Sequence, residues 1–294
     1  MPEPRPPASP ARASMVDAYA QVFVRLSPRY PRPVSEVHPP GREARAEQLL
    51  TAMDGAGVGQ AVVAALSTED EYLRECLAAH SDRLVGLSTL DLRHPSARAD
   101  LARKAGTPGV RGIRVHWLGM PDADPEETPA YEPLGDLAEA GLVMWFFGPR
   151  GQLPLLDRLL SRLAGLTVVL GHLGLPLTPL RPGRHGTPRP IRPPASTLDE
   201  VLALARHPGC HVALCGQASF SQEPYPYRDL DPLVRALYRA YGAERLLWGS
   251  DAPWSLSDPG YERALELPDC QLPGLSAEER QAILGGNARR LFRL

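Results

Sequence analysis

Short apolar runs alternate with amphipathic stretches along most of the chain. The apolar runs predict eight strands, at Val16–Val24, Val58–Leu66, Leu84–Leu92, Val110–His116, Leu142–Phe147, Thr167–Leu173, Cys210–Gly216 and Leu246–Asp251. The amphipathic stretches predict helices near Glu43–Ala56, Glu69–His80, Pro95–Ala105, Pro133–Ala140, Pro154–Leu163, Thr197–Arg206, Leu230–Tyr241 and Ser276–Leu284. Strands that alternate with helices in this way indicate a parallel β/α fold.

The eight β/α pairs fit one closed barrel. No glycine-rich GxGxxG turn follows the first strand, which argues against a doubly wound dinucleotide-binding fold. We therefore predict an α/β protein, a single (β/α)8 TIM barrel over residues 15–294, after a disordered Pro-rich tail at residues 1–14. Barrel enzymes carry their active sites at the carboxyl ends of the strands, so we expect the functional residues there.

Composition narrows the classes of function. The 294 residues include 32 Lys and Arg against 34 Asp and Glu, and a net charge of −2 excludes polycationic binding to nucleic acid. No apolar run approaches the roughly 20 residues that span a bilayer, and the first residues lack the apolar segment of a signal peptide. We expect a cytoplasmic protein with a small-molecule substrate and no membrane partner, and the sequence leaves a homo-oligomer open.

Lysine and cysteine usage limits the chemistry further. Lys104 is the only lysine and lies in a predicted outer helix, so no inward lysine is expected to form a Schiff base or to bridge two metals as a carbamate. The four cysteines contain no CxxC pair, and Cys210 and Cys215 should face opposite sides of one strand. We expect free thiols and no cofactor.

Two polar side chains interrupt apolar strands where the barrel mouth is expected. Asp251 ends the apolar run of LLWGSDAPW, and its structural alternative is a turn or a helix cap. His172 interrupts TVVLGHLGLP between glycines that would let a ligand approach the backbone, and its alternative is a buried structural histidine. We predict that both side chains are catalytic.

The fourth strand adds candidates for substrate binding. Arg114 and His116 lie two residues apart near the end of PGVRGIRVH. A guanidinium presents a rigid fork of donors to a carboxylate, so Arg114 is a candidate for binding an anionic substrate, and an internal ion pair is the alternative. His116 and the aromatic Trp254 are further candidates for substrate contacts.

Five motifs carry a family resemblance. VDAYAQVF, GVRGIRVH, VVLGHLGLP, LLWGSDAPW and LGGNARRLF follow one another in the order seen in amidohydrolase family 2, a family of metal-dependent hydrolases. The chain resembles this family over nearly its whole length after Met15. The PRYPRP segment after the first strand is most similar to the sugar lactonase and 2-pyrone-4,6-dicarboxylate lactonase branches, while other branches are aromatic-acid decarboxylases and hydratases.

The first strand departs from the family pattern. Members usually carry a His-x-His pair where this chain has Tyr19 and Gln21, and the usual histidine of the fifth strand aligns with Phe147. Asp251 alone cannot hold a zinc ion, which takes three protein ligands in an open catalytic site. The resemblance therefore implies a barrel without a catalytic metal, in which His172 serves acid/base chemistry or substrate polarisation.

These residues suit metal-independent hydrolysis of a lactone or activated ester on a small carboxylated metabolite. Asp251 would be the general base toward water, while His172, Tyr19 or Arg114 would donate to the developing oxyanion, and Gln21 would contact the substrate. A metal-free cyclase, dehydratase or decarboxylase of an unsaturated metabolite would use the same groups. A ligand-binding pseudoenzyme is the second alternative.

Overall fold

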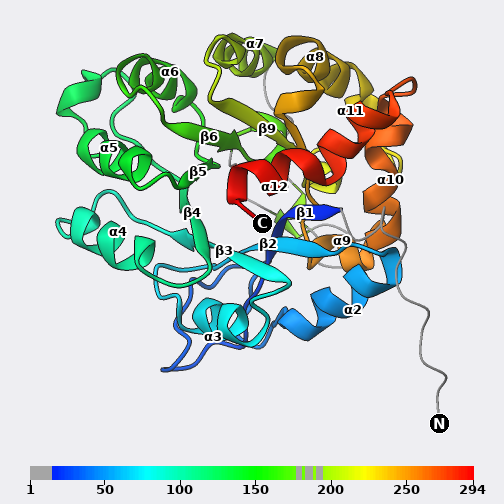
Figure 1. Cartoon of the computed structure of the whole chain (residues 1–294), viewed down its shortest axis with the longest axis horizontal. Helices are drawn as coiled ribbons and strands as arrows, with labels where there is room; N and C mark the ends of the chain where they lie inside the picture. The colour runs from blue at the N-terminus through cyan, green and yellow to red at the C-terminus, as the bar shows by residue number, and fades with distance from the viewer. Residues whose placement is uncertain (1–14, 177–180, 183–187, 190–194) are drawn as a thin grey trace.

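Eight parallel strands form a ring at the centre of the molecule (Figure 1), in a computed structural model that describes residues 15–176, 181–182, 188–189 and 195–294. The strands are β1 (Val16–Gln21), β2 (Gln60–Ala64), β3 (Leu84–Thr89), β4 (Val110–Val115), β5 (Val143–Phe146), β6 (Thr167–Leu170), β9 (Cys210–Leu214) and β10 (Leu246–Trp248), and they pair in this order. The predicted (β/α)8 barrel is confirmed. The tail predicted at residues 1–14 lies outside the described residues.

Helices surround the ring (Figure 1). They are α2 (Ala46–Ala56), α3 (Glu71–Ala79), α4 (Ala97–Ala105), α5 (Tyr131–Glu139), α6 (Leu153–Arg162), α7 (Ala195–Ala203), α8 (Asp231–Tyr241), α9 (Trp254–Ser257), α10 (Tyr261–Gln271), α11 (Ala277–Gln281) and α12 (Asn287–Phe292). A short antiparallel pair, β7 (Arg181–Pro182) and β8 (Pro188–Arg189), lies between β6 and α7 in the sequence. Among the described residues, no helix has the length and apolar character needed to cross a bilayer.

Successive side chains face opposite sides of the sheet, so the apolar residues of seven strands divide between two cores, and β4 is the exception. On β4, Ile113 and Val115 pack in the core beneath the helices, whereas Arg114 between them faces the barrel interior. Cys210 and Cys215 likewise belong to different cores, as predicted, and both are free thiols. The interior core includes Phe292 of α12, and this helix lies across the ring of strands in Figure 1.

The seam between β1 and β10 closes the barrel with few backbone contacts. Ala20 forms an isolated bridge with Ala252, and the Asp251 amide donates to the Tyr19 carbonyl over 3.0 Å. The carboxylate of Asp17 adds to this seam, because it accepts hydrogen bonds from the Ser250 amide at 2.8 Å and from the Tyr261 hydroxyl at 2.9 Å. Asp17 was not among the residues predicted from the sequence. The available signal was one acidic residue within the apolar first strand.

The predicted strands are too long at their carboxyl ends. The strand predicted at Leu246–Asp251 ends at Trp248, and the one predicted at Thr167–Leu173 ends at Leu170. Just beyond these ends, His172 and Asp251 adopt left-handed conformations, with φ of 54° and 60°, which are incompatible with a regular extended strand. The apolar pattern continues past these points, since the residues remain buried although they are no longer in the ladder.

Lys104 lies in the outer helix α4, as predicted, but its side chain is buried rather than solvated. It is 1% exposed, and its ammonium donates to Asp70, to Ser88 Oγ at 3.1 Å and to the Thr68 carbonyl at 2.8 Å. Ser88 follows Leu87 on β3. Because Leu87 faces the interior core, Ser88 faces the helix side of the sheet. Lys104 therefore joins α4 to β3 from the helix side of the sheet.

Candidate active site

The carboxyl ends of the strands bring together the side chains predicted as the core of the site: Tyr19, Gln21, Arg114, His172 and Asp251. Each of them is at most 9% exposed. Their grouping at one mouth was predicted from the sequence and is confirmed. Their chemical roles stay predictions.

Tyr19 is the centre of the polar network. The Tyr19 hydroxyl accepts hydrogen bonds from Gln21 Nε2 and from Arg114 Nη1, each at 3.1 Å. Burial raises the pKa of Tyr19, so the phenol keeps its proton at neutral pH. Both neighbours act as donors, and that proton has no acceptor among the described residues. Tyr19 therefore holds a fixed hydrogen-bond donor for a ligand.

Arg114 uses only some of its N–H donors for hydrogen bonds within the protein. Besides Tyr19, its guanidinium donates through Nη2 to the carbonyl of Ala65. Its Nε is buried and has no described partner. Because a guanidinium has five N–H donors, Arg114 can hold Tyr19 and still offer donors to an anionic group.

His172 and Asp251 lie side by side. His172 Nε2 is 3.4 Å from Asp251 Oδ1, and both side chains are buried. The other ring nitrogen of His172 and the Oδ1 atom of Asp251 form no hydrogen bond with a described residue. Left-handed backbone at a residue other than glycine stores strain and is concentrated at functional sites, and both residues adopt it here.

Aromatic rings hold the imidazole of His172 in place. Phe147 stacks on it with ring centroids 4.0 Å apart and planes inclined by 10°. Tyr19 meets it edge-on at 5.4 Å, and Phe220 does so at 6.4 Å. The family resemblance implied that Phe147 takes the place of a ligand histidine, and in the structure its ring packs against the candidate catalytic residue His172.

His116 follows β4 and is a neutral hydrogen-bonding group. Its Nδ1 lies 2.6 Å from the carbonyl of Phe147, which can only accept, so Nδ1 carries a proton. Burial lowers the pKa of His116 to about 4, and the positive charge of Arg114 adds to this. The remaining ring nitrogen is therefore an acceptor at neutral pH, suited to a substrate hydroxyl.

Trp254 is buried, but its ring packs on the loop after β1 rather than on the polar network. Its neighbours are the imidazole of His38, with centroids 5.2 Å apart, and the guanidinium of Arg42, 4.0 Å from the ring centre. No role for His38 was predicted from the sequence. Burial lowers its pKa to about 4, helped by the charges of Arg32 and Arg42, and its Nε2 is buried without a described partner.

The residues at the mouth do not fit a catalytic zinc ion. The first-strand positions are taken by a phenol and an amide that bind each other, and Phe147 offers no donor atom. In the part of the chain that the structure describes, no three His, Cys, Asp or Glu side chains group closely enough to hold a metal. A catalytic zinc normally has three protein ligands.

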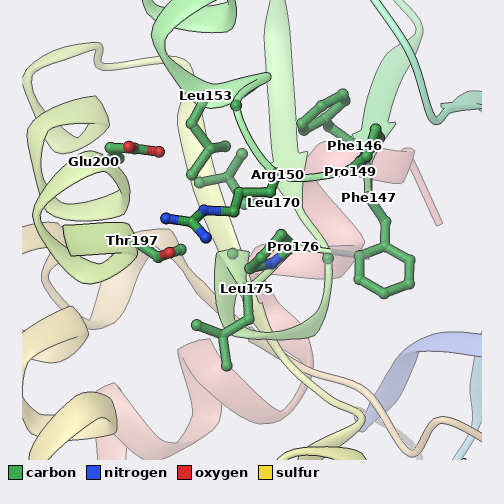
Figure 2. A pocket seen from close by; sticks show the side chains of 14 residues that line it. Phe146, Phe147, Pro149, Arg150, Leu153, Leu170, Leu175, Pro176, Thr197 and Glu200 are labelled. Carbon is green, nitrogen blue, oxygen red and sulfur yellow. The ribbon is translucent and has the colours of Figure 1, made fainter. Parts of the chain in front are cut away.

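A separate pocket borders the site (Figure 2). In this view the Arg150 guanidinium lies between Thr197 and Glu200, while the ring of Phe147 turns to the other side. The pocket wall includes Phe146 and Leu170, which belong to the core beneath the helices. The pocket therefore lies on the helix side of β5 and β6, away from the polar network around Tyr19.

Comparison with known proteins identifies the family. The sequence model of the family described as amidohydrolase matches residues 14–294. The chain belongs to the amidohydrolase family. An L-fucono-1,5-lactonase from Burkholderia ambifaria is 31% identical to this amidohydrolase over 249 residues, which is 79% of each chain. The protein is thus an enzyme of a hydrolase family and resembles a lactonase.

Solved structures of the family share the barrel. A structure from Pseudomonas putida described as a 2-pyrone-4,6-dicarboxylic acid hydrolase is 27% identical, with a TM-score of 0.73, and covers 96% of this chain and 98% of its own. An amidohydrolase from Burkholderia multivorans with bound zinc is 22% identical, with a TM-score of 0.75, and covers 95% of this chain and 99% of its own. At that identity the zinc-containing structure supports the fold alone.

Proposed function

We propose that this amidohydrolase opens the lactone ring of a small carboxylated metabolite, with Asp251 as the general base and without a catalytic metal. The proposal rests on a carboxylate oxygen and a hydroxyl proton at the same mouth of the barrel, neither of which has a hydrogen-bond partner among the described residues. Asp251 Oδ1 accepts no hydrogen bond from a described residue, and the Tyr19 proton has no described acceptor. Similarity to a lactonase supports the substrate class.

In the proposed reaction, Asp251 takes a proton from water as the water oxygen bonds to the lactone carbonyl carbon. The carbonyl electrons move to oxygen, and the Tyr19 hydroxyl donates a hydrogen bond to this oxyanion. The bond to the ring oxygen then breaks, and that oxygen receives the proton from Asp251. The product is an open-chain hydroxy acid, and Asp251 is again a carboxylate.

The remaining mouth residues fit substrate binding. Arg114 has N–H groups left for a substrate carboxylate, and its charge compensates that of an anion. His116 accepts from a substrate hydroxyl, and Gln21 has a buried oxygen without a described partner. His172, next to Asp251, polarises the substrate through its free ring nitrogen.

A reactive carbonyl is what makes the reaction feasible without a metal. Zinc lowers the pKa of bound water to about 7, whereas a general base accelerates a reaction about 100-fold to 10,000-fold. An unactivated amide would need more assistance than these residues provide. A lactone carbonyl is more electrophilic, so base catalysis and one oxyanion donor suffice.

The test is a panel of lactones, each offered with and without a carboxylate and analysed by mass spectrometry. We expect a mass gain of one water, a preference for the carboxylated members, and full activity after dialysis against a chelator. Asp251→Asn should lower kcat by at least about 100-fold with little change in KM. Near-normal turnover by this variant, or activity that disappears with the metal, contradicts the proposal, and a product of unchanged mass points to a cyclase.

A further inference from the structure

A second cavity adjoins Asp251. It lies where the end of β9, the loop before α8 and the segment after β10 meet, and its lining includes Cys215, Tyr227, Asp251, Ser255 and Asp258. Its volume is about 20 Å³. A buried water needs at least about 10 to 15 Å³ of such space, so the cavity has room for about one water molecule.

Three buried polar atoms of this cavity lining lack a partner among the described residues: Asp251 Oδ1, Ser255 Oγ and the Tyr227 hydroxyl. The three side chains belong to residues that are at most 4% exposed. Buried polar groups nearly always have a hydrogen-bond partner. Three exceptions among the residues that line one small space point to a shared polar occupant.

The chemistry of the lining selects water. Burial and the nearby Asp258 carboxylate raise the pKa of Tyr227, so its hydroxyl keeps a proton to donate. The carboxylates of Asp251 and Asp258 disfavour an anion in the same space. No cluster of metal-ligating side chains occurs in the described part of the chain. Water can donate to a carboxylate and accept from two hydroxyls, and buried waters typically make about three hydrogen bonds.

We propose that this cavity holds one ordered water molecule that donates a hydrogen bond to Asp251 and is held by Tyr227 and Ser255. Its catalytic consequence rests on the proposed function of Asp251 as general base, in which the second carboxylate oxygen, Oδ2, takes the proton while Oδ1 accepts a hydrogen bond from the ordered water. Without such a bond, Oδ1 has His172 Nε2 at 3.4 Å, which makes no aligned hydrogen bond with it. The water fixes the rotation of the carboxylate, so Tyr227 and Ser255 are positioning residues.

Crystal structures of the wild type and of a Tyr227→Phe/Ser255→Ala double variant test the water site itself. We expect a density peak within hydrogen-bond distance of Asp251 and both hydroxyls in the wild type, and its loss in the double variant. Ser255→Thr retains a hydroxyl and should retain the peak. A wild-type cavity without density, or a peak that anomalous scattering identifies as a cation, overturns the proposal.

Kinetics test the positioning role. Loss of a hydrogen bond to a charged group should lower kcat of the double variant about tenfold while KM changes little, and Ser255→Thr, which keeps a hydroxyl, should retain most of the wild-type rate. Tyr238→Phe and Ser161→Ala are matched controls, because their hydroxyls bind Glu279 and the Asp157 carbonyl on outer helices. Unchanged kcat in a double variant that has lost the water refutes the positioning role. Activity in Asp251→Asn would refute the proposed function instead, and leave the crystallographic result standing.

Discussion

The imidazole of His172 fits its surroundings so closely that one neighbour has to be glycine. A Cβ built on Gly216 would lie 2.2 Å from Cδ2 of His172, which no real contact allows. Gly216 also has a φ of 68°, a left-handed conformation that side chains disfavour. With Phe147 stacked on one ring face, the imidazole cannot move aside without breaking that contact.

Gly216→Ala should therefore displace His172 and lower kcat/KM at least tenfold. A displacement of about 1 Å at a reacting group can lower the reaction rate about 100-fold. Gly165→Ala is the matched control, since Gly165 has a φ of 85° and open space where its Cβ would lie. Both variants should lose about 1 kcal/mol of stability from backbone strain. Equal activities in the two variants, measured beside their melting temperatures, would show that the contact with His172 is not important for turnover.

A site residue could be predicted from the sequence only when the pattern of its own segment marks it. His172 and Asp251 interrupt apolar strands, so a polar residue in an apolar run was enough to find them. Asp17 interrupts an apolar strand as well, but its role in closing the barrel depends on a hydrogen bond from Tyr261, 244 residues away. His38 lies in a loop with no pattern, and its packing against Phe23 and Trp254 is seen only in the structure.

At the scale of elements, a buried ion pair joins α4 to β3 and to the segment before α3. Lys104 and Asp70 are 1% and 7% exposed, and Ser88 hydrogen-bonds to both. Removing one member of a buried ion pair leaves the other charge without a partner in a medium of low polarity. The pair lies outside the barrel mouth, so its contribution should appear in stability rather than in turnover.

Lys104→Met should lower the free energy of unfolding by about 3 to 5 kcal/mol, because Asp70 is left buried without its partner. The Lys104→Met/Asp70→Asn double variant should recover part of this loss. Arg93→Met breaks an exposed pair with Asp91 and should cost at most about 1 kcal/mol. Denaturant unfolding measures all three. An unchanged midpoint for Lys104→Met would mean that the buried pair contributes no net stability.

Helices and strands could be predicted from the sequence where the hydrophobic pattern reflects which side chains are buried. All eight strands of the barrel were found, because each is an apolar run between polar segments. Helix α10 (Tyr261–Gln271) was missed, since Pro268 lies inside it and proline normally ends a helical pattern. The carboxyl end of the helix predicted at Ser276–Leu284 is a π-helical segment, Ala282–Gly286, a geometry that side-chain periodicity does not distinguish.

For the molecule as a whole, Asp17 makes the closure of the barrel dependent on pH. Burial raises its pKa from 3.8 to about 6, although the amides of Ser250 and Tyr19 and the Tyr261 hydroxyl donate to it. Folding thus favours the protonated carboxyl. This contribution to stability is fully present below the unfolded pKa near 3.8 and is lost as pH rises through about 6.

Asp17→Asn imitates the protonated carboxyl at every pH. Relative to the wild type, the variant should gain up to about 3 kcal/mol in free energy of unfolding as the pH rises from about 4 to 8. Chemical denaturation at a series of pH values measures this difference. Parallel stability curves for the two proteins would show that Asp17 has the same proton affinity in the folded and unfolded chains.

The seam between β1 and β10 also sets an order of events during synthesis. Asp17 and Ser250 are 233 residues apart, and at about 5 to 20 residues per second the ribosome takes roughly 10 to 50 seconds to make the second after the first. The strands pair in the order of their synthesis, so each new strand can add to the edge left by the one before. Any sheet that the earlier strands form before β10 is made would leave the edge of β1 unpaired, the kind of surface that templates aggregation and that chaperones cover. Closure at Asp17 is therefore the event that ends the exposure of the nascent sheet.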